Sequence, residues 1–515
     1  MADADEIDPE GLLSPGEQRF ETLRKITGLW LGPLVFLLLL IFPPGGLSPD
    51  AARLAPILAL TLIWWMCEPV PIPVTAILAP ALCVAFGVAP AKDLFASFGD
   101  PIVFLFIGGF VLAEAMMCHG LDRRIALGLL GLKWVGNSLP RVFFVFGGIA
   151  TVLSMWLSNT ATTAMMAPIA IGIVGEITTI MRRSENGKDS SAQASRMATG
   201  LMLLLAYGAS IGGLATPVGT PPNLIGIGMI REQLQVNLSF FGWMLFALPA
   251  SLLMFAVLYL VIFRQYVAGG AAITGLQEYL ASRRAGLGRW TAGQVNTLVA
   301  FGLAVVLWVL PGVIGLIPGA SAEHIAKTYD KLLPEGVVAV LAASLLFLLP
   351  TSLHNPQPTL TWRQASRIDW GTILLFGGGI ALGKLAFSTG LANKMGEAIL
   401  HGTSVSSLGT ITLMAIIFGI LISETTSNTA SATMVVPVAI SVAHAAGINP
   451  LAPALGACMG ASFGFMLPVS TPPNAIVYGT GYVPITRMVR TGVLFDVIGA
   501  GLIWCTVMIA AHFIS

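Results

Sequence analysis

Charge is the scarcest property of this sequence. Only 10% of its 515 residues are charged, whereas an ordinary soluble protein carries about 25%. So few charges cannot cover a water-facing surface, and the mean hydropathy is +0.85. The formal net charge of +1 offers no basic surface for DNA or RNA. These shortages exclude a soluble enzyme, a nucleic-acid-binding protein and a disordered scaffold.

Side chains that ligate metals or attack substrates are also few. The six histidines and five cysteines are scattered along the chain. They do not have the spacing of a metal site, a catalytic triad or a disulfide framework. The sequence therefore predicts a protein that is not an enzyme and holds no organic cofactor.

Apolar residues make up 56% of the chain. Because about 20 apolar residues cross a bilayer, this length allows on the order of ten spanning helices. Runs such as 30–43 and 252–263 are continuously apolar, unlike the alternating strands of a membrane barrel. The first ten residues are acidic and contain no base, so they are not a signal peptide. We expect an all-α, multi-pass protein of the inner (cytoplasmic) membrane, with a cytoplasmic N-terminus.

Two short polar motifs each occur twice, in the same order. Ser-Asn-Thr-Ala begins at Ser158 and at Ser427, and Thr-Pro-Pro-Asn begins at Thr220 and at Thr471. Each Ser-Asn-Thr lies in the middle of an apolar stretch about twice the length that crosses a bilayer, which predicts a re-entrant hairpin. Each Pro-Pro predicts a broken helix, because proline cannot donate to the preceding turn. The predicted hairpins span 142–180 and 407–446, and the broken helices span 199–229 and 451–482.

The distribution of basic residues gives the two halves opposite orientations. Lysines and arginines flank the first hairpin and occupy the connector, while few flank the second hairpin. Since cytoplasmic loops are enriched in Lys and Arg, the first hairpin enters from the cytoplasm and the second from outside. This predicts an inverted-repeat transporter with its site near the bilayer midplane. The expected organisation is a cytoplasmic tail at 1–27, a first repeat at 28–263, a cytoplasmic connector at 264–290 and a second repeat at 291–515.

The duplicated motifs predict sites for both an anion and a cation. A broken helix exposes backbone amides and the positive end of its dipole, which attract anions. Ser, Thr and Asn are natural N-caps there. The freed carbonyls and nearby hydroxyls form an oxygen-rich cage that suits a hard cation such as Na⁺. Two such ends suit a substrate with two negative groups, held without any arginine.

The motifs resemble those of the divalent anion:sodium symporter family, which moves dicarboxylates, citrate and, in some branches, sulfate. The resemblance rests on Ser158-Asn-Thr-Ala-Thr-Thr-Ala with Ala215-Thr-Pro-Val-Gly-Thr-Pro-Pro-Asn223, and on Glu424-Thr-Thr-Ser-Asn-Thr-Ala-Ser with Ser470-Thr-Pro-Pro-Asn-Ala-Ile-Val. It covers the chain from about residue 30 to the end. It implies a homodimer with about 11 spanning helices and two hairpins per subunit, in which a transport domain slides against a scaffold as an elevator.

The resemblance also implies which residues bind the ligands. The implied substrate-binding residues are Ser158, Asn159, Thr160, Thr220, Ser427, Asn428, Thr429, Thr471 and Pro472. A first Na⁺ site would use Ser154, Ser158, Asn159 and the Gly219 carbonyl, and a second would use Ser423, Thr426, Asn428 and the Ser470 carbonyl. The four-residue spacing of Ser154 and Ser158, and of Ser423 and Ser427, agrees with this because it puts both hydroxyls on one helical face.

The implied function is import of C4-dicarboxylates such as succinate, malate or fumarate by Na⁺ symport. Sodium-independent exchange of dicarboxylate or citrate on the same fold stays open as an alternative. An ion channel would need a lined pore or charged rings, and the closed hairpin tips argue against one.

Three charged residues inside apolar stretches also keep two interpretations. Glu424 could tune Na⁺ or a proton, or it could brace the hairpin. Glu114 and Lys384 occupy matched positions 270 residues apart. They could pair across the two halves, or each could lie at a helix end.

Overall fold

The computed structural model describes residues 15–136, 138–184, 188–267, 276–352, 354, 356–403 and 407–514. Within these ranges the regular elements are helices, with an isolated bridge between Pro350 and Pro358. Ten helices of the described chain are long and apolar enough to cross a membrane, or up to eleven if one bent pair counts as a single span. The predicted all-helical, multi-pass fold is confirmed.

The helices of the two halves follow one another with short connections. The first half contains α1 (Pro15–Ile41), α2 (Pro49–Cys67), α3 (Ile72–Ala85), α4 (Ala91–Phe95), α5 (Pro101–Cys118), α6 (Leu121–Leu130), α7 (Leu139–Ser154), α8 (Asn159–Ser184), α9 (Lys188–Leu214), α10 (Pro221–Leu234), α11 (Phe240–Ile262) and α12 (Leu276–Ala285). The second half contains α13 (Ala292–Gly315), α14 (Ala320–Leu332), α15 (Glu335–Leu348), α16 (Trp362–Ala365), α17 (Trp370–Ser388), α18 (Leu391–Thr403), α19 (Leu408–Thr425), α20 (Asn428–Ala445), α21 (Leu451–Gly460), α22 (Pro472–Gly479) and α23 (Ile485–Ile514).

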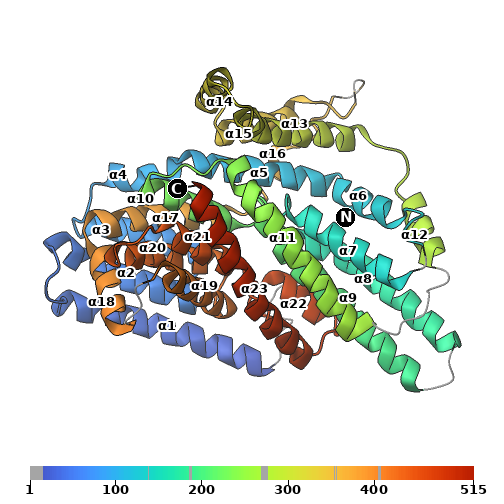
Figure 1. Ribbon diagram of the computed structural model, residues 1–515, viewed down its shortest axis with the longest axis horizontal. Coiled ribbons are helices and arrows are strands. Elements are labelled where there is room, and N and C mark those ends of the chain that lie inside the picture. The colour runs from blue at the N-terminus through green and yellow to red at the C-terminus, as the bar shows by residue number, and fades with distance from the viewer. Residues whose placement is uncertain are drawn as a thin grey trace.

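The outer helices carry apolar side chains on their outward faces. Figure 1 shows α13, α14 and α15 along one side of the molecule and α1 along the other. In the apolar 18-residue stretch of each helix, only 11% of the residues of α1 and 17% of those of α13 are buried inside the protein. Large apolar side chains that point outward fit a protein whose solvent there is lipid. In contrast, the apolar 18-residue stretch of α9 is completely buried, so the core lies around this helix.

The N-terminal boundary differs from the predicted one. We expected a tail as far as residue 27, but α1 begins at Pro15, and the cytoplasmic location of this segment stays a prediction. Good helix formers such as Glu, Gln, Arg and Leu fill this stretch, so the helix continues beyond its apolar part. Residues 1–14 lie outside the described ranges, as do residues 268–275 of the predicted connector.

Helices end and begin at each duplicated motif, as a hairpin tip or a helix break requires, while the predicted segment bounds and the re-entry into the membrane stay predictions. The first hairpin consists of α7 and α8, and the second consists of α19 and α20. The chain is non-helical at residues 215–220, between α9 and α10, and at 461–471, between α21 and α22. That the two halves are inverted with respect to the membrane stays a prediction.

The two halves pack crosswise around these breaks. Within each half, the hairpin packs against the helix before the break, as α7 and α8 do on α9 and as α19 and α20 do on α21. The helix after the break crosses to the other half, so that α10 packs against α20 and α22 packs against α8. All four motifs are thereby brought into one region.

Glycines at matched positions of the two halves allow close helix crossings. Gly108 lies where α5 packs on α15, and Gly378 lies where α17 packs on α3. A Cβ added at Gly108 would be 2.5 Å from the backbone of Ala339, and one added at Gly378 would overlap the carbonyl oxygen of Ala76. Small residues permit this approach between membrane helices.

We predict that Gly378→Ala destabilises the protein by about 1–3 kcal/mol, because the new methyl group meets backbone that cannot rotate away. The thermal unfolding midpoint of the purified protein in detergent measures this. Gly302→Ala on α13 is the matched control, since a Cβ there meets nothing within 4 Å. Equal midpoints for the two variants would contradict the predicted close crossing.

Candidate functional site

Four helices begin at one cavity. α8 and α20 start inside the two Ser-Asn-Thr motifs, and α10 and α22 start at the first proline of the two Thr-Pro-Pro-Asn motifs. The first amides of a helix have no partner within it. Side chains cap some of them, since Ser158 Oγ accepts from the Ala161 amide at 3.1 Å and Ser427 Oγ accepts from the Ala430 amide at 3.2 Å. The remaining amides and the four helix dipoles make this region attractive to anions.

The cavity has a volume of about 560 Å³, which suits a small organic ligand. Residues of all four motifs line it. The predicted substrate-binding residues on its wall are Ser158, Asn159, Thr160, Thr220, Ser427, Asn428, Thr429, Thr471 and Pro472. Gly219 and Ser470, whose carbonyls were predicted to bind Na⁺, also line it. The structure thus brings these residues together, and their roles as ligand contacts stay a prediction.

The other predicted sodium ligands lie behind the cavity wall. Ser154 and Ser423 are fully buried. Their hydroxyls make the same contact in the two halves, because Ser154 Oγ donates to Asn159 Oδ1 at 2.7 Å and Ser423 Oγ donates to Asn428 Oδ1 at 2.7 Å. Thr426 is also buried, and its hydroxyl donates to the Ile422 carbonyl at 2.9 Å.

These contacts leave oxygen atoms gathered at both hairpin tips. A hard cation prefers hydroxyl, amide and backbone carbonyl oxygens of this kind. The side chains therefore fit two Na⁺ sites, one at each tip.

A buried asparagine stabilises each helix break. Asn223 donates through Nδ2 to the carbonyls of Gly213 and Thr216, both at 2.8 Å. Asn474 donates in the same way to the carbonyls of Gly464 and Leu467, at 2.9 and 3.0 Å. These carbonyls have lost their helical partners. Both asparagines belong to the duplicated motif, but no role was predicted for them from the sequence, although their repetition after each Pro-Pro was the available signal.

We predict that Asn474→Ala destabilises the protein by about 2–4 kcal/mol. It leaves the interior Gly464 carbonyl without its donor, and the Leu467 carbonyl keeps only the Ser470 amide, at 3.3 Å. It should also abolish any rise in unfolding temperature that ligands produce, because the break frames the cavity. Asn296→Ala is the control, since Asn296 Nδ2 also bonds a carbonyl, that of Pro350, at 3.1 Å, but Asn296 does not line the cavity. A ligand-induced shift that survives in Asn474→Ala and is lost in the control would contradict this assignment.

Glu424 braces the second helix break. Its carboxylate accepts from the amides of Met466 and Leu467, at 2.8 and 3.3 Å, and from the Ser470 hydroxyl at 2.5 Å. The side chain is only 3% exposed. Of the two interpretations left open for Glu424, the structure shows the brace, and tuning of a bound ion stays untested.

A second buried acid was missed by the sequence analysis. Asp496 on α23 is 5% exposed, and Glu424 is the ionisable group that acts on it electrostatically. Among the described residues no amide or hydroxyl donates to a carboxyl oxygen of Asp496, and its side-chain hydrogen-bond neighbour is Glu424. An acid in the middle of an apolar spanning helix was the available signal.

The two acids should therefore respond differently to neutralisation. We predict that Glu424→Gln destabilises the protein by about 1–3 kcal/mol, because an amide nitrogen would face donors that need an acceptor. Asp496→Asn should keep or raise the unfolding temperature, because an asparagine amide can still donate to the Glu424 carboxylate and cannot add a second negative charge beside it in a low-dielectric interior. Thermal unfolding of both variants checks this, and a larger loss in Asp496→Asn than in Glu424→Gln would refute it.

Charged side chains also lie on the cavity wall. We expected a substrate site without arginine, yet Arg367 lines the cavity together with Glu114 and Asp369. Glu114 accepts from Cys118 Sγ at 3.3 Å. Among the described residues no ion pair joins Glu114 to Lys384, so the pairing interpretation of these two residues gains no support.

Comparison with known proteins identifies the family. The family model for the sodium:sulfate symporter transmembrane region matches residues 24–513. The chain belongs to this family. It is a multi-pass membrane transporter and not an enzyme, as the sequence predicted.

Curated relatives match along most of the chain. A sodium-dependent dicarboxylate transporter, SdcS, of Staphylococcus saprophyticus is 33% identical over 483 residues, which is 92% of this chain and 89% of the relative. SdcS of Staphylococcus aureus strain USA300 is 32% identical over 487 residues, with the same coverage of both chains.

Two solved structures share the fold at low identity. The YdaH transporter of Alcanivorax borkumensis has a TM-score of 0.55 and 13% identity, covering 88% of this chain and 98% of its own. MtrF of Neisseria gonorrhoeae has a TM-score of 0.50 and 12% identity, covering 91% of this chain and 97% of its own. At these identities the likeness concerns the fold alone, which is that of a membrane transporter.

Proposed function

We propose that this protein imports C4-dicarboxylates, such as succinate, malate or fumarate, by symport with Na⁺ across the cytoplasmic membrane. The observation that carries the proposal is the cavity at which four helix N-termini meet, with a Ser-Asn-Thr tip on each side. Two anion-attracting tips suit a rod-like substrate with a carboxylate at each end. The relatives that match 92% of the chain are named as sodium-dependent dicarboxylate transporters, which supports the same substrate class.

Sodium would have an electrostatic role in this site. A dianion loses its hydration when it enters a low-dielectric interior, and that cost is several kcal/mol per charge. A Na⁺ bound behind each tip would oppose this cost, because its positive charge would lie close to the substrate carboxylates. The Asn159 and Asn428 side chains connect the two places, since both line the cavity and contact the buried serines. Sodium binding would therefore precede substrate binding and complete the anion site.

The transport step in this proposal is an elevator movement. The hairpins and broken helices would form a transport domain, which slides against a scaffold that contains the outer helices. We further propose that the protein is a homodimer in the inner membrane with its N-terminus in the cytoplasm, and that each subunit carries its own site. The charge asymmetry around the two hairpins supports this orientation.

We predict that uptake of labelled succinate into liposomes holding the purified protein requires an inward Na⁺ gradient and no internal substrate. Uptake that ignores Na⁺ but needs internal dicarboxylate or citrate would establish the exchange alternative instead. Labelled sulfate serves as the substrate control, and transport of sulfate in place of succinate would overturn the proposed substrate class.

We also predict that Asn159→Ala or Asn428→Ala lowers uptake to near background while the protein still folds. Each substitution removes a side-chain amide that lines the cavity and whose Oδ1 accepts a hydrogen bond from a buried serine hydroxyl. Retained size-exclusion behaviour and unfolding temperature would verify folding. Asn296→Ala, away from the cavity, should keep uptake, and normal uptake in either cavity variant would reject the assigned site.

A further inference from the structure

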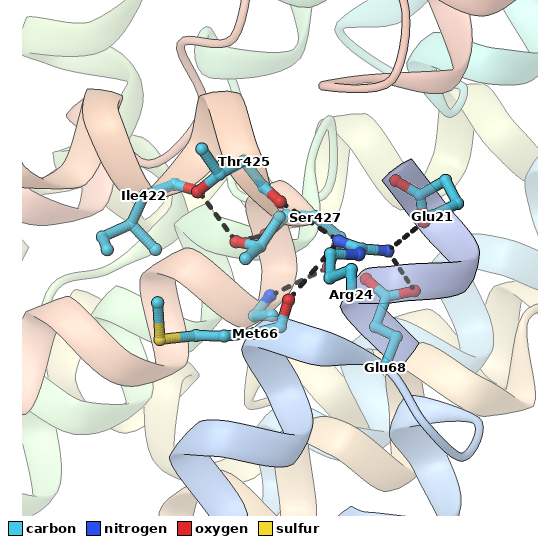
Figure 2. A network of polar contacts seen from close by, with 9 residues as sticks. Glu21, Arg24, Met66, Glu68, Ile422, Thr425 and Ser427 are labelled. Carbon is cyan, nitrogen blue, oxygen red and sulfur yellow. Dashed lines mark hydrogen bonds and ion pairs between the residues drawn. The ribbon is translucent and has the colours of Figure 1, made fainter. Parts of the chain in front are cut away.

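Arg24 joins the first helix of the chain to the tip of the second hairpin. Figure 2 shows its guanidinium between the end of α19 and the corner that follows α2. Nη1 donates to the Thr425 carbonyl at 3.1 Å and to the Met66 carbonyl at 3.4 Å. Nη2 pairs with Glu21 at 2.7 Å and with Glu68 at 3.7 Å. The contact to Thr425 connects residues 401 positions apart.

The position of this cation suits the end of a helix. Thr425 is the last residue of α19, and the last carbonyls of a helix have no partner within it. They carry the negative end of the helix dipole, so a cation beside them is favourable. Arg24 is only 16% exposed, which limits screening by solvent.

Two acids hold the guanidinium in this orientation. Glu21 lies one helical turn before Arg24, and Glu68 closes α2 with a left-handed backbone, at φ 48° and ψ 46°. A residue with a side chain adopts this conformation at a cost, which the surrounding contacts must offset. Burial raises the pKa of the Glu68 carboxyl, and the nearby Arg24 opposes that rise. The corner thus fixes Arg24 from the side opposite to the hairpin.

The carbonyl that Arg24 binds directly precedes the proposed ligands. Thr426 is a proposed second-site Na⁺ ligand, and Ser427 lines the cavity. At this point the chain leaves α19 in an extended conformation, with Thr426 at φ −140° and ψ −178°. Thr425 is itself exposed, and its hydroxyl donates to the Ile422 carbonyl at 3.1 Å. The Thr426 amide donates to the same carbonyl at 2.9 Å. Because the Thr425 carbonyl and the Thr426 amide belong to one peptide group, Arg24 and the Ile422 carbonyl hold this group from its two sides. Loss of Arg24 would let the group turn and displace the Thr426 hydroxyl.

We propose that Arg24 is a positioning residue that fixes the tip of the second hairpin, and through it the second Na⁺ site. The part that concerns sodium rests on the proposed function, whereas the positioning of the tip does not. Arg24 touches neither substrate nor ion in this arrangement. It acts through the Thr425 carbonyl.

Hydrogen–deuterium exchange of the intact protein tests the positioning directly. In Arg24→Gln, amides of residues 426–431 should exchange on the order of fivefold faster than in the wild type, the factor that corresponds to loss of about 1 kcal/mol. Arg24→Lys should restore much of the protection, because an ammonium can still donate to the carbonyl. Arg53→Gln is the matched control, since Arg53 forms an exposed ion pair with Asp50 on α2.

Sodium titration of uptake gives the second readout. The Na⁺ concentration for half-maximal uptake should rise severalfold in Arg24→Gln, by on the order of fivefold, while the maximal rate at saturating Na⁺ changes less. Unchanged exchange at 426–431 in Arg24→Gln would overturn the positioning role, as would equal acceleration in the Arg53 control. Faster exchange together with sodium-independent uptake by the wild type would support the positioning role and reject the proposed sodium coupling.

Discussion

The structure depends on how a backbone interrupted inside a membrane satisfies its polar groups. An unpaired amide or carbonyl in hydrocarbon costs several kcal/mol, and this chain interrupts its helices in four places. The carbonyls at the two breaks are bound by Asn223 and Asn474. At the four helix starts, which meet at one cavity, Ser158, Ser427 and Thr471 each cap one amide, and other first-turn amides have no partner within the helix. The site therefore attracts anions through the amides at the helix starts that the protein itself leaves without a partner.

The crosswise packing of the halves explains why these interruptions are tolerated. Each helix that follows a break is covered by the hairpin of the other half, α10 by α20 and α22 by α8. The buried Cys458 thiol of α21 donates to the carbonyl of Pro222, at the start of α10, at 3.1 Å. Non-helical backbone is thus enclosed by protein rather than by lipid, as the physics of the bilayer requires.

The fold class and, through the resemblance of the motifs, the family were predicted from the sequence, and the helix ends at the motifs follow from local patterns. A polar triplet between two apolar arms, or two adjacent prolines, determines the conformation within a few residues. The nine predicted substrate-binding residues all lie on one cavity wall, because the crosswise packing of the halves brings the four motifs together.

What the sequence analysis missed depends on contacts between distant segments. Arg24 was assigned to a tail, yet it binds the carbonyl of Thr425. Asp496 is far from Glu424 in the sequence, and only the folded structure places the two acids side by side. Arg367 likewise lies outside the four motifs but lines the cavity in the folded protein. No spacing rule links such residues, because the interaction arises from packing and not from periodicity.

The crosswise packing also bears on how such a chain could arise. A polypeptide holding one half alone would contain a hairpin without the helix that covers it and a broken helix without the hairpin that shields it. It could complete both only by associating with a second molecule. A single-unit ancestor of this architecture would therefore have had to work as a pair of identical chains, and joining two copies in one gene would have made their association intramolecular.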